Sequence, residues 1–160
     1  MKKLLALAAL VVVGILSSSP LLAQESPFVG TWKINLAKSK FAGAPAPKSE
    51  TRTVVTQGNG WKLSFDGVAA DGSKISWSFT TNLDGKPAPV TGSGAPSGAD
   101  MLAVKRIDAN TVTTSYLKAG KEVRTSRSTV SADGKVTTIT AKFTDASGEP
   151  VTTVTVWDKQ

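Results

Sequence analysis

The side chains with which this chain could do chemistry are twelve carboxylates and nineteen Lys and Arg residues, because it contains neither His nor Cys. The commonest general base and the usual ligands of transition metals are therefore missing. The carboxylates do not suggest a catalytic pair, since Asp71, Asp84 and Asp133 each precede Gly in turn-like sequences. The sequence predicts no catalytic residue, no metal site and no cofactor, and it favours a protein that is not an enzyme.

The basic residues predict a solvated surface rather than a nucleic-acid site. The formal net charge is +7, of which Lys2 and Lys3 contribute two charges. The other bases are scattered along the chain, and among them only Lys105 and Arg106 are adjacent. A nucleic-acid footprint requires clustered bases, so no specific nucleic-acid partner is expected.

Residues 1–23 have the features of an export signal. Lys2 and Lys3 precede an uncharged apolar stretch over residues 4–16, and Ala23 supplies the small residue at which signal peptidase cleaves. This stretch of about 13 residues is shorter than the roughly 20 of a transmembrane helix, so we expect a cleaved signal-peptide helix rather than a retained anchor. Cleavage after Ala23 would release residues 24–160 as one periplasmic or secreted domain. Without Cys, that domain has neither a lipid-modified Cys nor disulfides.

The rest of the chain alternates apolar and polar residues in short segments that predict consecutive antiparallel strands. Gly-containing turns separate these segments, and connections this short force neighbouring strands to pair. A meander of this length curls closed to remove its exposed edges. The predicted fold is therefore all-β, a single up-and-down antiparallel barrel of 8–10 strands. The ten candidate strands are residues 28–35, 50–57, 61–68, 73–81, 87–91, 100–107, 111–118, 121–131, 135–144 and 149–157.

Alternation also assigns faces to the predicted strands. Trp61, Leu63 and Phe65 share one face of their segment, and Ile75, Trp77 and Phe79 share one face of the next. These six side chains are predicted to point inward. The later strands are rich in Thr, namely Thr125, Thr129, Thr138, Thr140, Thr153 and Thr155. Their interior face must be partly polar, which fits either a hydrated ligand cavity or a barrel filled by its own side chains.

The segment Phe28-Val29-Gly30-Thr31-Trp32 resembles the N-terminal Gly-x-Trp signature of the lipocalin and fatty-acid-binding-protein superfamily. Three further stretches extend the likeness through most of the chain. Together they resemble a group of exported bacterial lipocalin-like proteins of unknown function, in the calycin superfamily. They are residues 30–41, residues 84–92 and residues 104–111.

The resemblance implies a calycin-type barrel in which Gly30 and Trp32 form the structural signature. In such barrels the Trp plugs one end and a basic side chain often stacks on it, for which Arg124 and Arg127 are the candidates. Because Val123, Thr125 and Arg127 share a strand face, Arg127 is the more favoured inward residue, although an exposed strand Arg is the alternative. The helical lid of fatty-acid-binding proteins is not expected, because Gly and Pro interrupt residues 43–47. An open loop over the barrel mouth is favoured instead.

The function hypothesis is that the barrel binds or carries a small, largely apolar molecule. The alternative is an envelope or extracellular interaction module with a filled barrel and no ligand. An internal void of about 300 Å³ or more with one open mouth would favour the carrier. The sequence leaves the oligomeric state open. The predicted ligand-lining residues are Trp61, Leu63, Phe65, Ile75, Trp77, Phe79, Tyr116 and Arg127.

Overall fold

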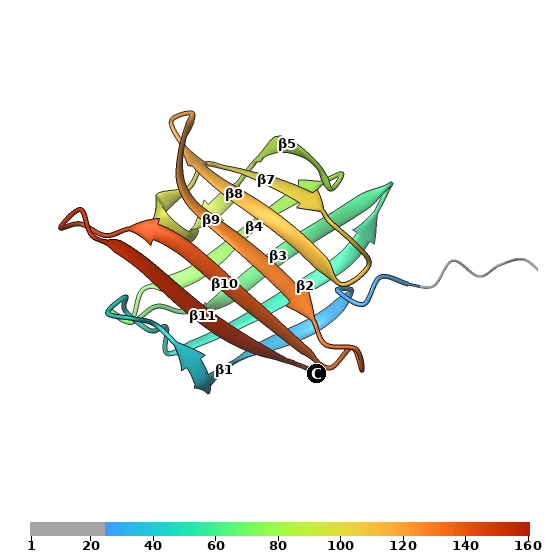
Figure 1. Ribbon diagram of the computed structural model, residues 1–160, viewed down its shortest axis with the longest axis horizontal. Coiled ribbons are helices and arrows are strands. Elements are labelled where there is room, and N and C mark those ends of the chain that lie inside the picture. The colour runs from blue at the N-terminus through green and yellow to red at the C-terminus, as the bar shows by residue number, and fades with distance from the viewer. Residues whose placement is uncertain (1–24) are drawn as a thin grey trace, which may run out of the picture.

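Segments in which apolar and polar side chains alternate form most of the eleven strands of a single antiparallel sheet. This sheet curls into a nearly closed barrel (Figure 1). This computed structural model describes residues 25–160, so the predicted signal peptide, residues 1–23, lies outside the described residues. The strands are β1 (Gly30–Lys40), β2 (Ser49–Gln57), β3 (Gly60–Val68), β4 (Lys74–Thr81), β5 (Asp84–Pro89), β6 (Thr91–Ser93), β7 (Met101–Arg106), β8 (Thr111–Lys118), β9 (Lys121–Val130), β10 (Val136–Thr144) and β11 (Pro150–Lys159).

The strand order follows the predicted up-and-down meander with one deviation. The sheet runs β5-β7-β8-β9-β10-β11-β1-β2-β3-β4-β6, so the first strand, β1, lies beside the last, β11 (Figure 1). The predicted fifth strand, residues 87–91, is instead two short strands at the two edges of the sheet: β5 pairs with β7 and β6 pairs with β4. Gly92 permits the second pairing, because a Cβ there would lie 2.1 Å from the carbonyl oxygen of Ser76.

Large side chains fill one end of the barrel. Trp32 is fully buried and donates its indole N–H to the carbonyl of Phe28 at 2.9 Å. The ring of Phe28 lies 5.1 Å from that of Trp61, and the guanidinium of Arg106 lies 5.0 Å from the centre of the same Trp61 ring. Trp32 thus plugs this end of the barrel, as the Gly-x-Trp resemblance implies.

The inward faces predicted for the third and fourth segments are confirmed. Trp61, Ile75, Trp77 and Phe79 are buried, and Leu63 and Phe65 pack against them in the same core. The register places Phe65 opposite Trp77, and their rings stack 3.9 Å apart. Aromatic rings therefore fill this wall of the barrel from the plugged end to near its middle.

Loops rather than a helix border the other end. The segment between β1 and β2 has no regular secondary structure, as its Gly and Pro residues predict. Within residues 25–160 the one helical element is a 3-10 turn, η1 (Pro96–Gly98). No helix in this described range is long and apolar enough to cross a membrane.

Candidate functional site

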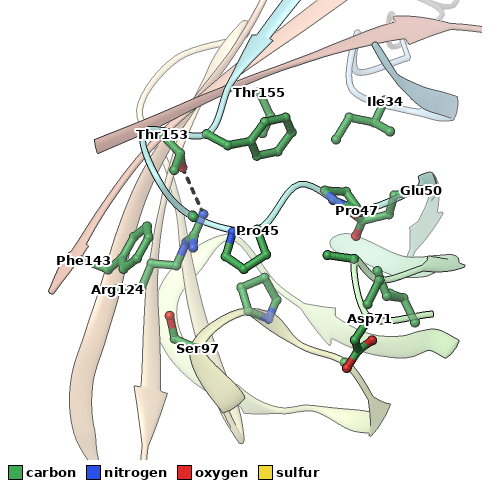
Figure 2. Close-up of a pocket in the computed structure, with 17 residues that line it drawn as sticks. Ile34, Pro45, Pro47, Glu50, Asp71, Ser97, Arg124, Phe143, Thr153 and Thr155 are labelled. Atoms are coloured by element: carbon green, nitrogen blue, oxygen red, sulfur yellow. Dashed lines mark hydrogen bonds between the residues drawn. The ribbon is translucent and has the colours of Figure 1, made fainter. Parts of the chain in front are cut away.

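A cavity of about 570 Å³ occupies the end of the barrel opposite the Trp32 plug. Its apolar wall includes Ile34 from β1, Ile75 from β4 and Phe143 from β10. Pro45 and Pro47, in the loop between β1 and β2, lie across the cavity, as Figure 2 shows. The volume exceeds the roughly 300 Å³ at which a pocket can take a small organic molecule.

Arg124 of β9 supplies a positive charge to the cavity wall. Its Nη2 donates a hydrogen bond of 3.4 Å to the hydroxyl of Thr153, drawn as the dashed line in Figure 2. The guanidinium lies against two aromatic rings, 4.7 Å from the centre of Phe143 and 5.7 Å from that of Tyr116. Its Nε is buried and has no hydrogen-bond partner among residues 25–160. Arg124 therefore brings a positive charge to the cavity wall and leaves one buried donor unpaired.

Arg52 of β2 lies deeper, between two Trp rings. Its guanidinium is 5.3 Å from the centre of Trp32 and 5.2 Å from that of Trp157. The side chain is 3% exposed, and its Nε and Nη2 have no hydrogen-bond partner in the described part of the chain. Burial lowers the pKa of Arg52 to about 10, against the opposing effects of Tyr116 and Glu50. A second positive charge thus lies inside the barrel, held by rings rather than by an ion pair.

Glu50 is the acid that lines the cavity wall near these arginines. It is two residues from Arg52 on β2 and therefore shares its inward face. Burial raises the pKa of Glu50 to about 7, although the nearby charges of Arg52 and Arg124 lower it. The ion pairs of residues 25–160 join Lys38 to Asp158 and Lys86 to Asp84, so neither arginine comes within ion-pair distance of Glu50. The interior therefore holds two cations and one acid that is not firmly paired.

The structure brings only one of the eight predicted lining residues to this cavity. Ile75 lines it, whereas Trp61, Trp77 and Phe79 are buried in the core away from it. Leu63 and Phe65 pack against the same core, and Tyr116 lies beneath Arg124 without lining the cavity. For the six apolar side chains of β3 and β4, alternation correctly indicated the inward direction, but it carries no information on how far along the barrel axis the empty volume begins.

The inward orientation predicted for Arg127 is wrong, because this side chain is exposed and the strand's other face points inward. Arg127 pairs with Thr140 on the outer surface, whereas Arg124 pairs with Tyr116 and Phe143 inside. The register between β8 and β9 shifts after Tyr116, which leaves Val123 as the extra residue of a bulge. Because the prediction treated Val123 as part of the regular alternation, it assigned Arg124 and Arg127 to the wrong faces of the strand.

The same register corrects the expected polar lining of the later strands. Four of the Thr residues lie on the outer face instead. There Thr129 pairs with Thr138, Thr140 pairs with Arg127, and Thr125 pairs with Lys142. Thr153 is buried and Thr155 lines the cavity, as predicted. The interior is nevertheless partly polar through other residues, and the buried ones include Thr114, Ser126, Ser128 and Thr137.

The basic side chains that stack on Trp32 were also not predicted. They are Arg52, at 5.3 Å from the ring centre, and Lys159, at 5.2 Å. Arg124 and Arg127, the two candidates from the sequence, do not contact this ring: one lines the cavity and the other is exposed. The alternation of the sequence did not indicate that Arg52 points inward. Its strand face also carries Glu50, and a face with two charged residues is expected to face solvent.

Four turn carboxylates have structural partners that lower their pKa values. Asp71, Asp133 and Asp145 accept side-chain hydrogen bonds from Ser73, Ser131 and Ser147 and then backbone N–H bonds within their turns, and Asp84 accepts the backbone N–H of Lys86. Residues 25–160 contain no group of three acidic side chains that could hold a metal ion. Asp71 also lies at the cavity rim, where Figure 2 shows it apart from Arg124.

Comparison with solved structures relates the barrel to a known fold. The ileal bile acid-binding protein of zebrafish, complexed with cholic acid, matches 84% of this chain and 100% of its own, with a TM-score of 0.55 and 14% identity. The fold is calycin-like. A structure named EF1p2_mFAP2b, bound to DFHBI, matches 84% of this chain and 94% of its own at 9% identity, with a TM-score of 0.46. No family model and no curated protein matches the sequence of this calycin-like barrel.

Proposed function

We propose that this calycin-like barrel binds or carries a small, largely apolar molecule in the cavity at its open end. The observation that carries the proposal is the cavity of about 570 Å³, bounded by Ile34, Ile75 and Phe143. A barrel that served only as an interaction module would gain nothing from leaving this volume unfilled, since empty apolar space destabilises a core. The zebrafish neighbour, which has cholic acid bound, supports the same general role for the fold.

The proposed ligand occupies only the outer part of the barrel interior. The inner part is filled by Trp32, Arg52 and Trp157 and by the stacked rings of Phe65 and Trp77. Burying some 200 to 300 Å² of ligand surface supplies at most roughly 5 to 8 kcal/mol before association costs. We therefore expect micromolar or weaker affinity for a purely apolar ligand.

Binding of the neutral dye Nile red tests this proposal. The protein is expected to bind one dye molecule and to increase its emission, because the dye moves from water into an apolar cavity. The variant Ile75→Trp should lose most of this signal, since the larger ring extends into the cavity from β4. Val55→Trp is the matched control, because Val55 is 45% exposed on β2. Equal binding by both variants, or none by the wild type, would contradict the proposal.

Export is the second part of the proposed function. It rests on Lys2, Lys3, the apolar residues 4–16 and Ala23, all of which precede the described part of the chain. A carrier that begins at residue 24 would act in the periplasm or outside the cell. The intact mass of the protein recovered from the extracytoplasmic fraction decides this, and a product that begins at Met1 would argue against export.

A further inference from the structure

We propose that the cavity selects compact, ring-shaped apolar molecules over long-chain lipids, because its floor lies close below its rim and cannot recede. The inference rests on the proposed binding function and deepens it by naming the shape of the ligand. It concerns a bicyclic or tricyclic molecule that fills the width of the cavity, in place of a chain that extends along the barrel axis.

The cavity ends at one layer of buried side chains that runs round the barrel. On each of β1, β2, β4, β9, β10 and β11, an inward residue lines the cavity, and the inward residue two positions deeper is buried and does not line it. The lining residues of these strands are Ile34, Glu50, Ile75, Arg124, Phe143 and Thr155. The buried residues below them, which we call the floor, are Trp32, Arg52, Trp77, Ser126, Ala141 and Trp157.

The cavity is therefore shallow for its volume. Successive inward residues of a strand are about 7 Å apart, and the strands of barrels are tilted, so one inward residue corresponds to about 5 to 7 Å of depth. Loops form the opposite boundary, where Pro45 and Pro47 lie across the cavity (Figure 2). A volume of about 570 Å³ with so little depth must be wide. Figure 2 shows Ile34 and Phe143 on opposite sides of it.

The floor is held in place by close packing. The guanidinium of Arg52 lies between two Trp rings, and the ring of Trp77 stacks on that of Phe65 at 3.9 Å. The next inward residues below Arg52 and Trp77 are Val54 and Phe79, which are also buried. Side chains packed in this way do not move aside without a loss of contacts. A ligand therefore cannot extend past the floor into the lower part of the barrel.

This shape favours a ring system over a chain. An apolar ligand gains affinity from the surface that it removes from water. A compact ring system can be enclosed between the floor and the loops without losing internal freedom. A long chain must either bend across the floor, which costs conformational entropy, or leave its end in water at the mouth. Affinity should therefore stop rising with chain length.

Calorimetric titration with adamantanol, decanol and dodecanol tests the inference. Adamantanol and decanol have the same number of carbon atoms, but decanol has more apolar surface and would bind more tightly if both were fully enclosed. We expect adamantanol to bind at least as tightly as decanol. Each buried methylene raises affinity roughly fourfold, so a fully enclosed dodecanol would bind about fifteenfold more tightly than decanol. We expect a gain of less than about threefold, because the added methylenes stay in water.

Three variants identify the floor as the cause. Trp77→Ala removes a floor ring and should let dodecanol bind about tenfold more tightly than decanol, because the chain can then extend downward. Trp77→Leu should change this ratio in the same direction by less. Trp61→Ala is the matched control, because Trp61 is equally buried but lies beside Phe28 at the plugged end. It should keep the wild-type ratio. Thermal unfolding shows which variants are folded, and the wild-type titrations test the inference without them.

The outcomes separate the two proposals. If decanol binds more tightly than adamantanol, or if dodecanol gains about fifteenfold over decanol in the wild type, the shape inference is wrong while the apolar carrier stands. If the folded Trp77 variants keep the wild-type ratio, the floor does not limit the length of the ligand and the inference is overturned. If no alcohol binds, both the carrier function and the shape inference are wrong.

Discussion

Replacing Trp32 by Ala is expected to lower the free energy of unfolding by about 3 to 5 kcal/mol, because it removes a fully buried indole and leaves a cavity. The substitution also removes the hydrogen bond to Phe28 and the ring that Arg52 and Lys159 contact. Equilibrium urea unfolding measures the loss as a lower midpoint with an unchanged slope.

The matched control for this prediction is Leu36→Ala on the same strand. Leu36 is 39% exposed, so its truncation should change the free energy of unfolding by about 0.5 kcal/mol or less. A loss below about 1 kcal/mol for Trp32→Ala would mean that the ring does not plug the barrel.

Glu50 is expected to make the protein less stable as pH rises. Its pKa is raised in the fold to about 7 from a reference of 4.5, so between these values the folded state binds more protons than the unfolded state. The contribution of Glu50 to the free energy of unfolding is therefore fully present below about pH 4.5 and is lost as pH rises to about 7. The shift in its pKa corresponds to a loss of about 3 kcal/mol in that free energy.

Comparing the wild type with Glu50→Gln at about pH 4.5 and about pH 8 isolates this contribution. Relative to the wild type, the variant should gain about 3 kcal/mol in unfolding free energy between the two pH values. Glu149→Gln, at an exposed position, should show no comparable gain. Parallel pH profiles for the wild type and Glu50→Gln would show that the Glu50 carboxyl titrates as it does in the unfolded chain.

The strands could be predicted because their side chains alternate strongly and Gly-containing turns separate them. The segment from Ser73 to Thr81 carries three large apolar residues on one face. The sequence therefore predicted both a strand here and the side of it that points inward. The edge pairing of β5 and β6 could not be predicted, because the two Pro and two Gly of residues 84–93 interrupt the alternation that marks a strand.

The candidate site was harder to predict, because its charged members violate the rule that charges face solvent. Glu50 and Arg52 alternate with Thr51 and Thr53, so polarity alone gave their strand no inward face. What places Arg52 inside is its position between Trp32 and Trp157, two rings from opposite ends of the described chain. In β9 the bulge at Val123 interrupts the period of two, so Arg127 was favoured over Arg124.

A crystal structure of the protein with decanol decides whether the open end of this barrel is a small-molecule site. We predict one alkyl chain inside the barrel, in contact with Ile34, Ile75 and Phe143, with Trp32, Arg52 and Trp157 unmoved beneath it. A cavity closed by its own side chains at saturating ligand, or a ligand bound only on the outer surface, would contradict it.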